Sequence, residues 1–366
     1  MFLEQTNMNT NARAIAFYLP QFYPTPENDK WWGEGFTEWT NVSRAKPLYK
    51  GHYQPKIPGK LSYYDLRLPS VREQQANLAR DAGIEGFCYW HYWFGNGQRL
   101  LDRVFREVVE SRKPNYPFCL CWANHTWYNK HWNPQQADRI LIEQTYPGTQ
   151  DYIDHFYAML PAFKDERYIK CNGKLLFGFF EPWGWNPSEF MDIWNQLAKQ
   201  NGLKGFHFFA FCYGLENYQK TNTQLFDSCV LDTLFDSVDY STRKHFFKTH
   251  HILSKTKPIN VASYNHYCQK TLQIFKSVSL IHPCIVPNFD HSPRSSTRGH
   301  ILYDNTPEAW GQLLSDTINF LSARPKEEKF VFIKAWNEWG EGNYLEPDMC
   351  LGSSYLEETR KALIGK

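Results

Sequence analysis

The sequence of 366 residues is distinguished first by features that it lacks. It has no long run of lysine and arginine, and its 40 basic and 38 acidic residues give a formal net charge of only +2. Because nucleic-acid-binding proteins usually have a strong basic surplus, we expect no nucleic-acid partner. No apolar segment approaches the roughly 20 residues of a membrane span, and the N-terminus lacks the basic and apolar regions of a signal peptide. A cytoplasmic protein without a membrane span is the simplest expectation.

Motifs for metals and cofactors are also missing. The nine cysteines form an odd, scattered set, and Cys119 and Cys121 have neither zinc-site spacing nor a second pair to complete a site. The sequence contains no His-Glu-x-x-His, no P-loop, no glycine-rich dinucleotide loop and no Asp-x-Asp. We therefore expect neither a metal nor a cofactor, and the missing motifs count against a nucleotide-sugar donor site.

Aromatic residues, in contrast, are abundant. They make up 17% of the chain, with 14 Trp, 22 Tyr and 27 Phe. Many of these rings are needed to fill a large core. Tryptophan and tyrosine also stack on the apolar faces of sugar rings, so the composition leaves both a structural and a carbohydrate-binding interpretation open.

Short apolar runs alternate with amphipathic helical patterns along the chain. Most runs are continuously apolar, as expected of parallel strands buried on both faces. The predicted strands are 13–22, 86–93, 117–124, 175–182, 205–213, 227–232, 284–290 and 330–338. The predicted helices are 68–84, 100–111, 149–165, 188–202, 261–277, 306–323 and 353–365. This alternation predicts an α/β fold, a single (β/α)8 TIM barrel over residues 13–366, after a flexible leader of residues 1–12.

The first connection between a strand and a helix, residues 23–64, is long and rich in Pro, Gly and Trp. Such a loop inside a compact domain is usually functional or disordered. Its aromatic content favours a folded lid at the mouth of the barrel.

In a (β/α)8 barrel the functional site forms at the C-terminal ends of the strands. Polar and aromatic residues follow most of the predicted strands, and their convergence favours a substrate-binding role over that of ordinary rim residues. The candidates are Tyr18, Gln21, Trp39, His91, Tyr92, Trp93, Trp122, Asn124, His125, Trp127, Glu181, Tyr213, Asp290, Trp336, Asn337, Trp339 and Glu346. Asp290 and Arg294 could orient a sugar hydroxyl or form a salt bridge with each other.

The segment KAWNEWGEGNYLEP, residues 334–347, carries the candidate catalytic pair Glu338 and Glu341. Two carboxylates at one barrel mouth suit acid–base chemistry, because one can be held protonated while the other stays ionised. Neighbouring tryptophans would supply a wall of low dielectric constant. Gly340 and Gly342 would let the backbone turn tightly and approach a ligand.

Four segments together resemble a known family: AFYLPQFYPTPENDKWWGEGFTEWTNV, GFCYWHYWF, FCLCWANHTW and WNEWGEGNYLEP. They are similar to the WbsX-type domain of polysaccharide gene clusters, which in turn is similar to glycoside hydrolase family 99, the endo-α-mannosidases. The resemblance implies a retaining mechanism on an α-mannose-like or α-rhamnose-like linkage. Glu338 would act as base on the 2-hydroxyl, giving a 1,2-anhydro sugar, and Glu341 would act as general acid/base.

One departure from the family pattern concerns substrate recognition. WbsX-type domains usually carry an acid in WANEN, whereas this chain has WANHT, with His125 and Thr126. Altered sugar recognition or an extra proton donor at His125 would follow. Two other functions stay open: a glycosyltransferase or assembly enzyme of surface polysaccharide, and a non-catalytic carbohydrate-binding barrel. In each case the partner would be an oligosaccharide or polysaccharide.

Overall fold

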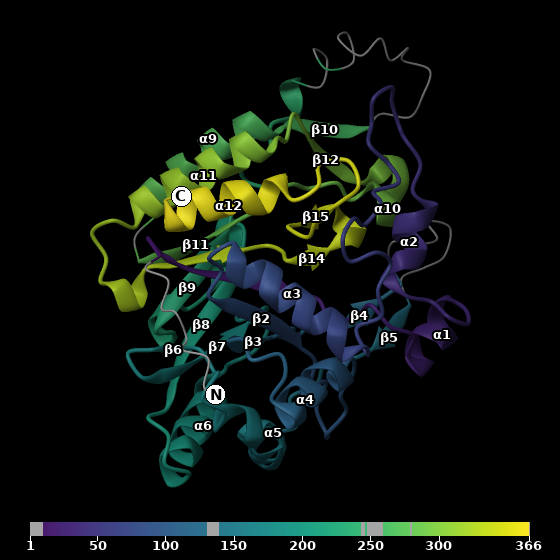
Figure 1. Cartoon of the computed structure of the whole chain (residues 1–366). Helices are drawn as coiled ribbons and strands as arrows, with labels where there is room; N and C mark the ends of the chain where they lie inside the picture. The colour runs from purple at the N-terminus through teal and green to yellow at the C-terminus, as the bar shows by residue number, and fades with distance from the viewer. Residues whose placement is uncertain (1–9, 130–138, 243–245, 247–258, 279, 366) are drawn as a thin grey trace, which may run out of the picture.

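The computed structural model describes residues 10–129, 139–242, 246, 259–278 and 280–365. Eight parallel strands close into a barrel, because β3 pairs with β7 as well as with β2 (Figure 1). In order around the barrel they are β1 (Arg13–Tyr18), β2 (Gly86–His91), β3 (Phe118–Trp122), β7 (Lys174–Phe179), β8 (Phe206–Tyr213), β9 (Ser228–Asp232), β11 (Ile281–Ile285) and β13 (Phe330–Ile333). The predicted (β/α)8 barrel is confirmed.

All eight predicted strands overlap strands of the barrel, and the seventh is displaced. We expected it at 284–290, but β11 ends at Ile285. The chain leaves the sheet there, since the backbone N–H of Val286 donates to the hydroxyl of Tyr267 instead of to a neighbouring strand. The apolar residues that follow belong to the connection that leads to Asp290.

Helices surround the barrel, and α9, α11 and α12 lie side by side on one flank (Figure 1). The seven predicted helices are present as α3 (Pro69–Asp81), α4 (Asp102–Ser111), α5 (Thr149–Phe163), α6 (Ser188–Gln200), α9 (Tyr264–Ser277), α11 (Pro307–Phe320) and α12 (Ser354–Ile364). A short helix that we did not predict, α7 (Leu215–Lys220), follows β8. In the described part of the chain, no helix is long and apolar enough to cross a membrane.

A second parallel pair of strands was not predicted either. β10 (Asn260–Ser263) pairs with β12 (His300–Tyr303) outside the barrel. The first residues of the predicted helix 261–277 belong to β10, and Ser263 caps α9 by accepting a hydrogen bond from the N–H of His266. The predicted start of this helix is therefore too early in the sequence, because the four-residue strand β10 runs directly into α9.

Aromatic rings fill much of the barrel interior. Phe17 of β1 stacks on Trp90 of β2, with ring centroids 4.6 Å apart, and meets Phe211 of β8 edge-on at 5.2 Å. Because β1 and β8 are not neighbours in the sheet, the second contact crosses the interior. All nine cysteines are free and seven of them are buried. A large share of the aromatic composition thus serves the core.

The long first connection is folded. It contains α1 (Pro26–Trp32) and α2 (Glu38–Arg44), and α2 packs against α10 (Ser292–Ser295) and η5 (Trp339–Glu341), which follow β11 and β13. The predicted lid therefore lies at the C-terminal end of the barrel.

The end of the predicted N-terminal leader is held by the folded chain. Residues 1–9 lie outside the described residues. The backbone N–H of Asn11 donates to the carbonyl of Leu363, and Ala12 is buried. The prediction of a flexible leader up to residue 12 is therefore wrong at its end.

Gly178 of β7 provides a test of the barrel interior. A Cβ at this position would overlap the ring of Phe209 on β8. Overpacking of this kind costs about 1–3 kcal/mol, so we expect Gly178→Ala to lower the free energy of unfolding by that amount in urea titrations. Gly184→Ala is the matched control, because its Cβ would meet only ordinary contacts at 3.7 Å and beyond. Equal stability of the two variants would contradict this packing.

Candidate active site

The two predicted catalytic carboxylates lie on one tight hairpin after β13. Its strands β14 (Asn337–Glu338) and β15 (Asn343–Tyr344) flank η5, which contains Glu341. Gly342 closes the turn with φ of +54°, and a Cβ there would come within 2.8 Å of the Cβ of Asp290. Glycine is therefore required by the turn and by its close approach to the segment after β11.

A single guanidinium bridges the carboxylates. Nη2 of Arg294 lies 2.7 Å from Oε1 of Glu338, and Nη1 lies 2.9 Å from Oε1 of Glu341. A third carboxylate joins from α2, since Oε2 of Glu38 lies 2.9 Å from Nη2 of Arg294. Glu338 and Glu341 thus face the same cation and not opposite directions.

Gly340 makes this approach possible. A Cβ at Gly340 would lie 2.5 Å from Oε2 of Glu38 and 2.8 Å from Nε of Arg294. We expected Gly340 to admit a ligand, and in the structure it admits the protein's own ion pair.

The cluster is largely, but not completely, removed from solvent. The side chains of Glu338, Arg294 and Glu341 are 10%, 17% and 21% exposed. The carboxyl groups and the guanidinium therefore keep partial contact with solvent.

The two carboxyl groups have unequal proton affinity. Burial, reinforced by the charges of Glu341 and Glu38, raises the pKa of Glu338 to about 8, although Arg294 opposes the shift. Burial also acts to raise the pKa of Glu341, but the positive charges of Arg294 and Lys334 hold it below its ordinary value. Burial thus favours the protonated form of Glu338, while the neighbouring cations favour the ionised form of Glu341.

A second cation supports Glu341. Nζ of Lys334, directly after β13, lies 3.2 Å from Oδ2 of the buried Asp232 and 4.4 Å from the ring centroid of Tyr213. Burial would lower the pKa of Lys334, but Tyr213, Asp232 and Glu341 together raise it well above its usual value. Lys334 is therefore charged.

Glu346 stabilises the position of the β14–β15 hairpin through hydrogen bonds. Its carboxyl group accepts hydrogen bonds from the hydroxyl of Tyr64, the amide of Gln75 and the indole N–H of Trp339. It is buried, and burial raises its pKa to about 7. Glu346 thus fastens the turn to the long first connection and to α3, and its carboxyl group is fully occupied by protein donors.

Several predicted substrate-binding residues instead lie in the core. Trp336 and Asn337 have no exposed surface, and Asn337 bonds both backbone polar groups of Leu19. Nine further candidates are buried and form hydrogen bonds with protein groups: Tyr18, Trp39, His91, Trp93, Trp122, Asn124, Asp290, Trp339 and Glu346. Asp290 bonds His52 and Gln54, so the predicted Asp290–Arg294 salt bridge is absent from these described residues.

The remaining candidates lie at the rim. They are Gln21, Tyr92, His125, Trp127, Glu181 and Tyr213; all except the buried Tyr92 are partly exposed. His125 rests on the ring of Phe180, with centroids 5.0 Å apart, and burial lowers its pKa to about 4. His125 is therefore neutral at pH 7, which does not suit the role of an extra acid.

Sequence reasoning missed Glu38, Lys334, Trp90 and Phe180. Trp90 and Phe180 are partly exposed, meet at 5.5 Å and cover the interior ring of Phe211 at the C-terminal end of the barrel. Glu38 stands in the segment FTEWTNV, where the only signal was its place beside Trp39.

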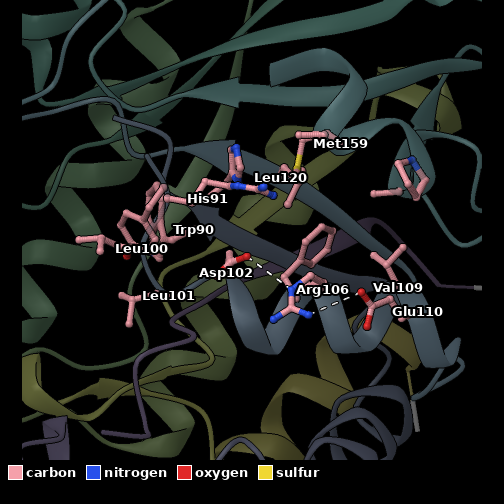
Figure 2. A pocket seen from close by; sticks show the side chains of 16 residues that line it. Trp90, His91, Leu100, Leu101, Asp102, Arg106, Val109, Glu110, Leu120 and Met159 are labelled. Atoms are coloured by element: carbon pink, nitrogen blue, oxygen red, sulfur yellow. Dashed lines mark ion pairs between the residues drawn. The ribbon is translucent and has the colours of Figure 1, made fainter. Parts of the chain in front are cut away.

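A cavity of about 140 Å³ lies between α4 and α5, and Figure 2 shows the side chains that line it. Leu101, Phe105, Leu120 and Met159 are among its apolar walls, while Arg106 bridges Asp102 and Glu110 at 3.6 Å each. Neither Glu338 nor Glu341 lines this cavity. Over the described ranges, no group of three or more His, Cys, Asp or Glu residues is placed to hold a metal ion.

The raised pKa of Glu338 has a measurable effect on stability. The pKa of Glu338 is higher in the folded than in the unfolded protein. Its carboxyl group therefore makes its full contribution to the free energy of unfolding below about pH 4.5, and this contribution is lost as the pH rises towards 8. Glutamine does not titrate, so the stability of Glu338→Gln relative to the wild type should increase between pH 5 and pH 8 in urea titrations. The exposed Glu34→Gln is the control. Parallel pH curves for wild type and Glu338→Gln would show that the carboxyl group is not desolvated.

Comparison with solved structures places the barrel among known folds. It is similar to the GH99 endo-α-mannosidase from Bacteroides thetaiotaomicron solved with BIS-TRIS-propane, with a TM-score of 0.57, 13% identity and coverage of 96% of this chain and 95% of that one. A protein described as glycoside hydrolase-like gives a TM-score of 0.61 at 12% identity, with coverage of 99% and 96%. At these identities the likeness concerns the fold alone.

Sequence comparison identifies the family. Two curated relatives, both described as uncharacterised protein WxcX and from two strains of Xanthomonas campestris pv. campestris, are 34% identical over 356 residues. The match covers 96% of this chain, which spans about half the length of these relatives. The family model described as Glycosyltransferase WbsX matches residues 14–359, so the resemblance found in the sequence is confirmed and the chain belongs to the WbsX family.

Proposed function

We propose that this protein is a retaining glycoside hydrolase that cleaves α-mannose-like or α-rhamnose-like linkages of an oligosaccharide or polysaccharide. The observation that carries the proposal is the arrangement of Glu338 and Glu341 on one turn at the C-terminal end of the barrel, held by one guanidinium and unequal in proton affinity. Two carboxyl groups with divergent pKa values provide an acid and a base for glycoside cleavage.

The family resemblance assigns the steps. Glu338 takes the proton of the sugar 2-hydroxyl while O2 attacks C1, and the bond from C1 to the leaving oxygen breaks as Glu341 protonates that oxygen. Glu341 then takes a proton from water as the water oxygen attacks C1. The bond between C1 and O2 opens, and O2 regains its proton from Glu338. The balance of protons is zero over the cycle.

The pKa shifts of the two carboxyl groups favour the opposite distribution of the proton. The proposed roles require an ionised Glu338 and a protonated Glu341, whereas burial favours a protonated Glu338. Since both groups contact Arg294, moving one proton between them leaves the net charge of the cluster unchanged. An exchange of the two roles, with Glu338 as the acid and Glu341 as the base, is therefore the direct alternative.

The description of the family names a second candidate, a glycosyltransferase. A nucleotide-sugar donor would place a diphosphate at the site, and a diphosphate needs unpaired cations. Arg294 already serves three carboxylates, and Lys334 is paired with Asp232. This charge distribution favours a neutral sugar. A non-catalytic carbohydrate-binding barrel would not need a buried acid pair.

Leaving-group chemistry tests the roles. On aryl α-mannosides or α-rhamnosides, Glu341→Gln should lose about 10²–10⁴-fold in kcat/KM with a poorly acidic phenol as leaving group, and much less with dinitrophenol, which departs without a proton. Glu338→Gln should lose about the same factor with both. The measurement is kcat/KM for each pair of substrates, with Glu34→Gln as control.

Three other outcomes each contradict part of the proposal. If only Glu338→Gln showed a dependence on the leaving group, Glu338 would be the acid and Glu341 the base. Undiminished turnover in both variants would remove the pair from the chemistry. Sugar transfer that depends on a nucleotide donor, with no hydrolysis of the glycoside panel, would favour the transferase.

A further inference from the structure

Two partly exposed tryptophans lie in contact beside the candidate active site. Trp31 lies in the last turn of α1, and Trp127 belongs to β4 (Trp127–Tyr128), which pairs with β5 (Ile140–Ile142). Their ring centroids are 6.1 Å apart at an interplanar angle of 64°. Figure 1 shows α1 beside the β4–β5 hairpin, although the two segments are far apart in the sequence.

An aromatic row connects these tryptophans with the carboxylates. Trp127 meets the ring of Tyr92 edge-on, with centroids 5.2 Å apart. Tyr92 follows β2, and the negative charges of Glu338 and Glu38 reinforce the effect of burial in raising the pKa of its hydroxyl. The aromatic row therefore runs from Tyr92, whose hydroxyl senses the charge of Glu338, through Trp127 to Trp31 at the rim.

The position of Trp31 is tied to the active site by charge. α1 and α2 belong to the same connection, and Glu38 at the start of α2 is bound to Arg294. The ion pair that holds Glu338 and Glu341 thus also anchors the segment next to α1. Trp31 therefore lies at the rim on α1, and the chain that follows α1 is held at the active site by Glu38.

The chemistry of this pair suits a sugar ring. A pyranose has an apolar face of C–H groups and a periphery of hydroxyls, and an indole offers a flat apolar ring with one N–H donor. Within the described ranges, neither indole N–H of Trp31 and Trp127 donates to a protein group, which leaves both donors for hydroxyls. Neither side chain carries a charge, which matches a neutral sugar.

We infer that Trp31 and Trp127 form a second sugar-binding subsite, which holds a neutral pyranose unit linked to the unit at Glu338 and Glu341. The inference rests on the proposed function and specifies its substrate class: oligosaccharides that extend from the cleaved bond towards α1. A glycoside of a single sugar cannot use this subsite.

The test compares substrates of different length. Trp31→Ala should lower kcat/KM for an α-linked mannotriose or rhamnotriose about tenfold more than for the aryl glycoside of the same sugar, mainly through KM. A tenfold change corresponds to about 1.4 kcal/mol, which is within the range of a stacking contact. Trp31→Phe keeps a ring and should restore most of the difference. Tyr157→Ala, which removes an exposed ring on α5, is the matched control and should not alter the ratio.

Calorimetric binding of the same trisaccharides separates this inference from the proposed function. Suppose that the wild type binds a trisaccharide but cleaves no glycoside, and that Trp31→Ala weakens the binding about tenfold. This result would support the sugar-binding subsite and contradict the proposed hydrolase function. If cleavage occurs with an unchanged length preference in Trp31→Ala, the subsite is wrong while the hydrolase holds. No binding of either trisaccharide by the wild type would overturn the subsite, and together with no cleavage of any glycoside it would overturn both proposals.

Discussion

The ion cluster around Arg294 is the interaction on which the candidate active site depends. Its guanidinium, on α10, joins Glu38 of the first connection to Glu338 and Glu341 of the hairpin, and so fixes three segments that are distant in sequence. Removing one partner of a buried ion pair typically costs 3–5 kcal/mol, because the remaining charge is left without compensation. The same cation stabilises the ionised form of Glu341 and limits the rise in the pKa of Glu338. Arg294 therefore influences both the position and the protonation of the two carboxyl groups.

Much of the fold could be predicted because parallel strands buried on both faces read as continuous apolar runs. The end of β11 could not be predicted, because the hydroxyl of Tyr267 on α9 binds the first backbone N–H after the strand. The presence of β10 could not be predicted either, because this four-residue strand runs directly into α9. For the candidate site, the sequence indicates which strand ends meet at one end of the barrel but not the direction of each side chain. Side chains alternate across a strand, so His91 contacts His155 of α5, while Trp90 packs inside the barrel. The contacts of Arg294 depend on tertiary packing that no local pattern records.

The family description and the charges of the site point to different chemistry. The description names a glycosyltransferase, whereas the cations at the carboxylate cluster are already paired with acids. A neutral sugar enters such a cluster without displacing a charge, and a diphosphate would have to compete with three carboxylates for Arg294. The aromatic row from Tyr92 to Trp31 is also uncharged, so both parts of the surface are compatible with the same neutral glycan.

A crystal structure of the Glu341→Gln variant with an uncleaved α-linked oligosaccharide tests the central claim most directly. The account predicts that the glycosidic oxygen lies within hydrogen-bonding distance of residue 341, that the 2-hydroxyl of the same sugar lies against Glu338, and that Arg294 still contacts Glu338. A glycan bound elsewhere, or one whose 2-hydroxyl and glycosidic oxygen are both remote from the two residues, would contradict it.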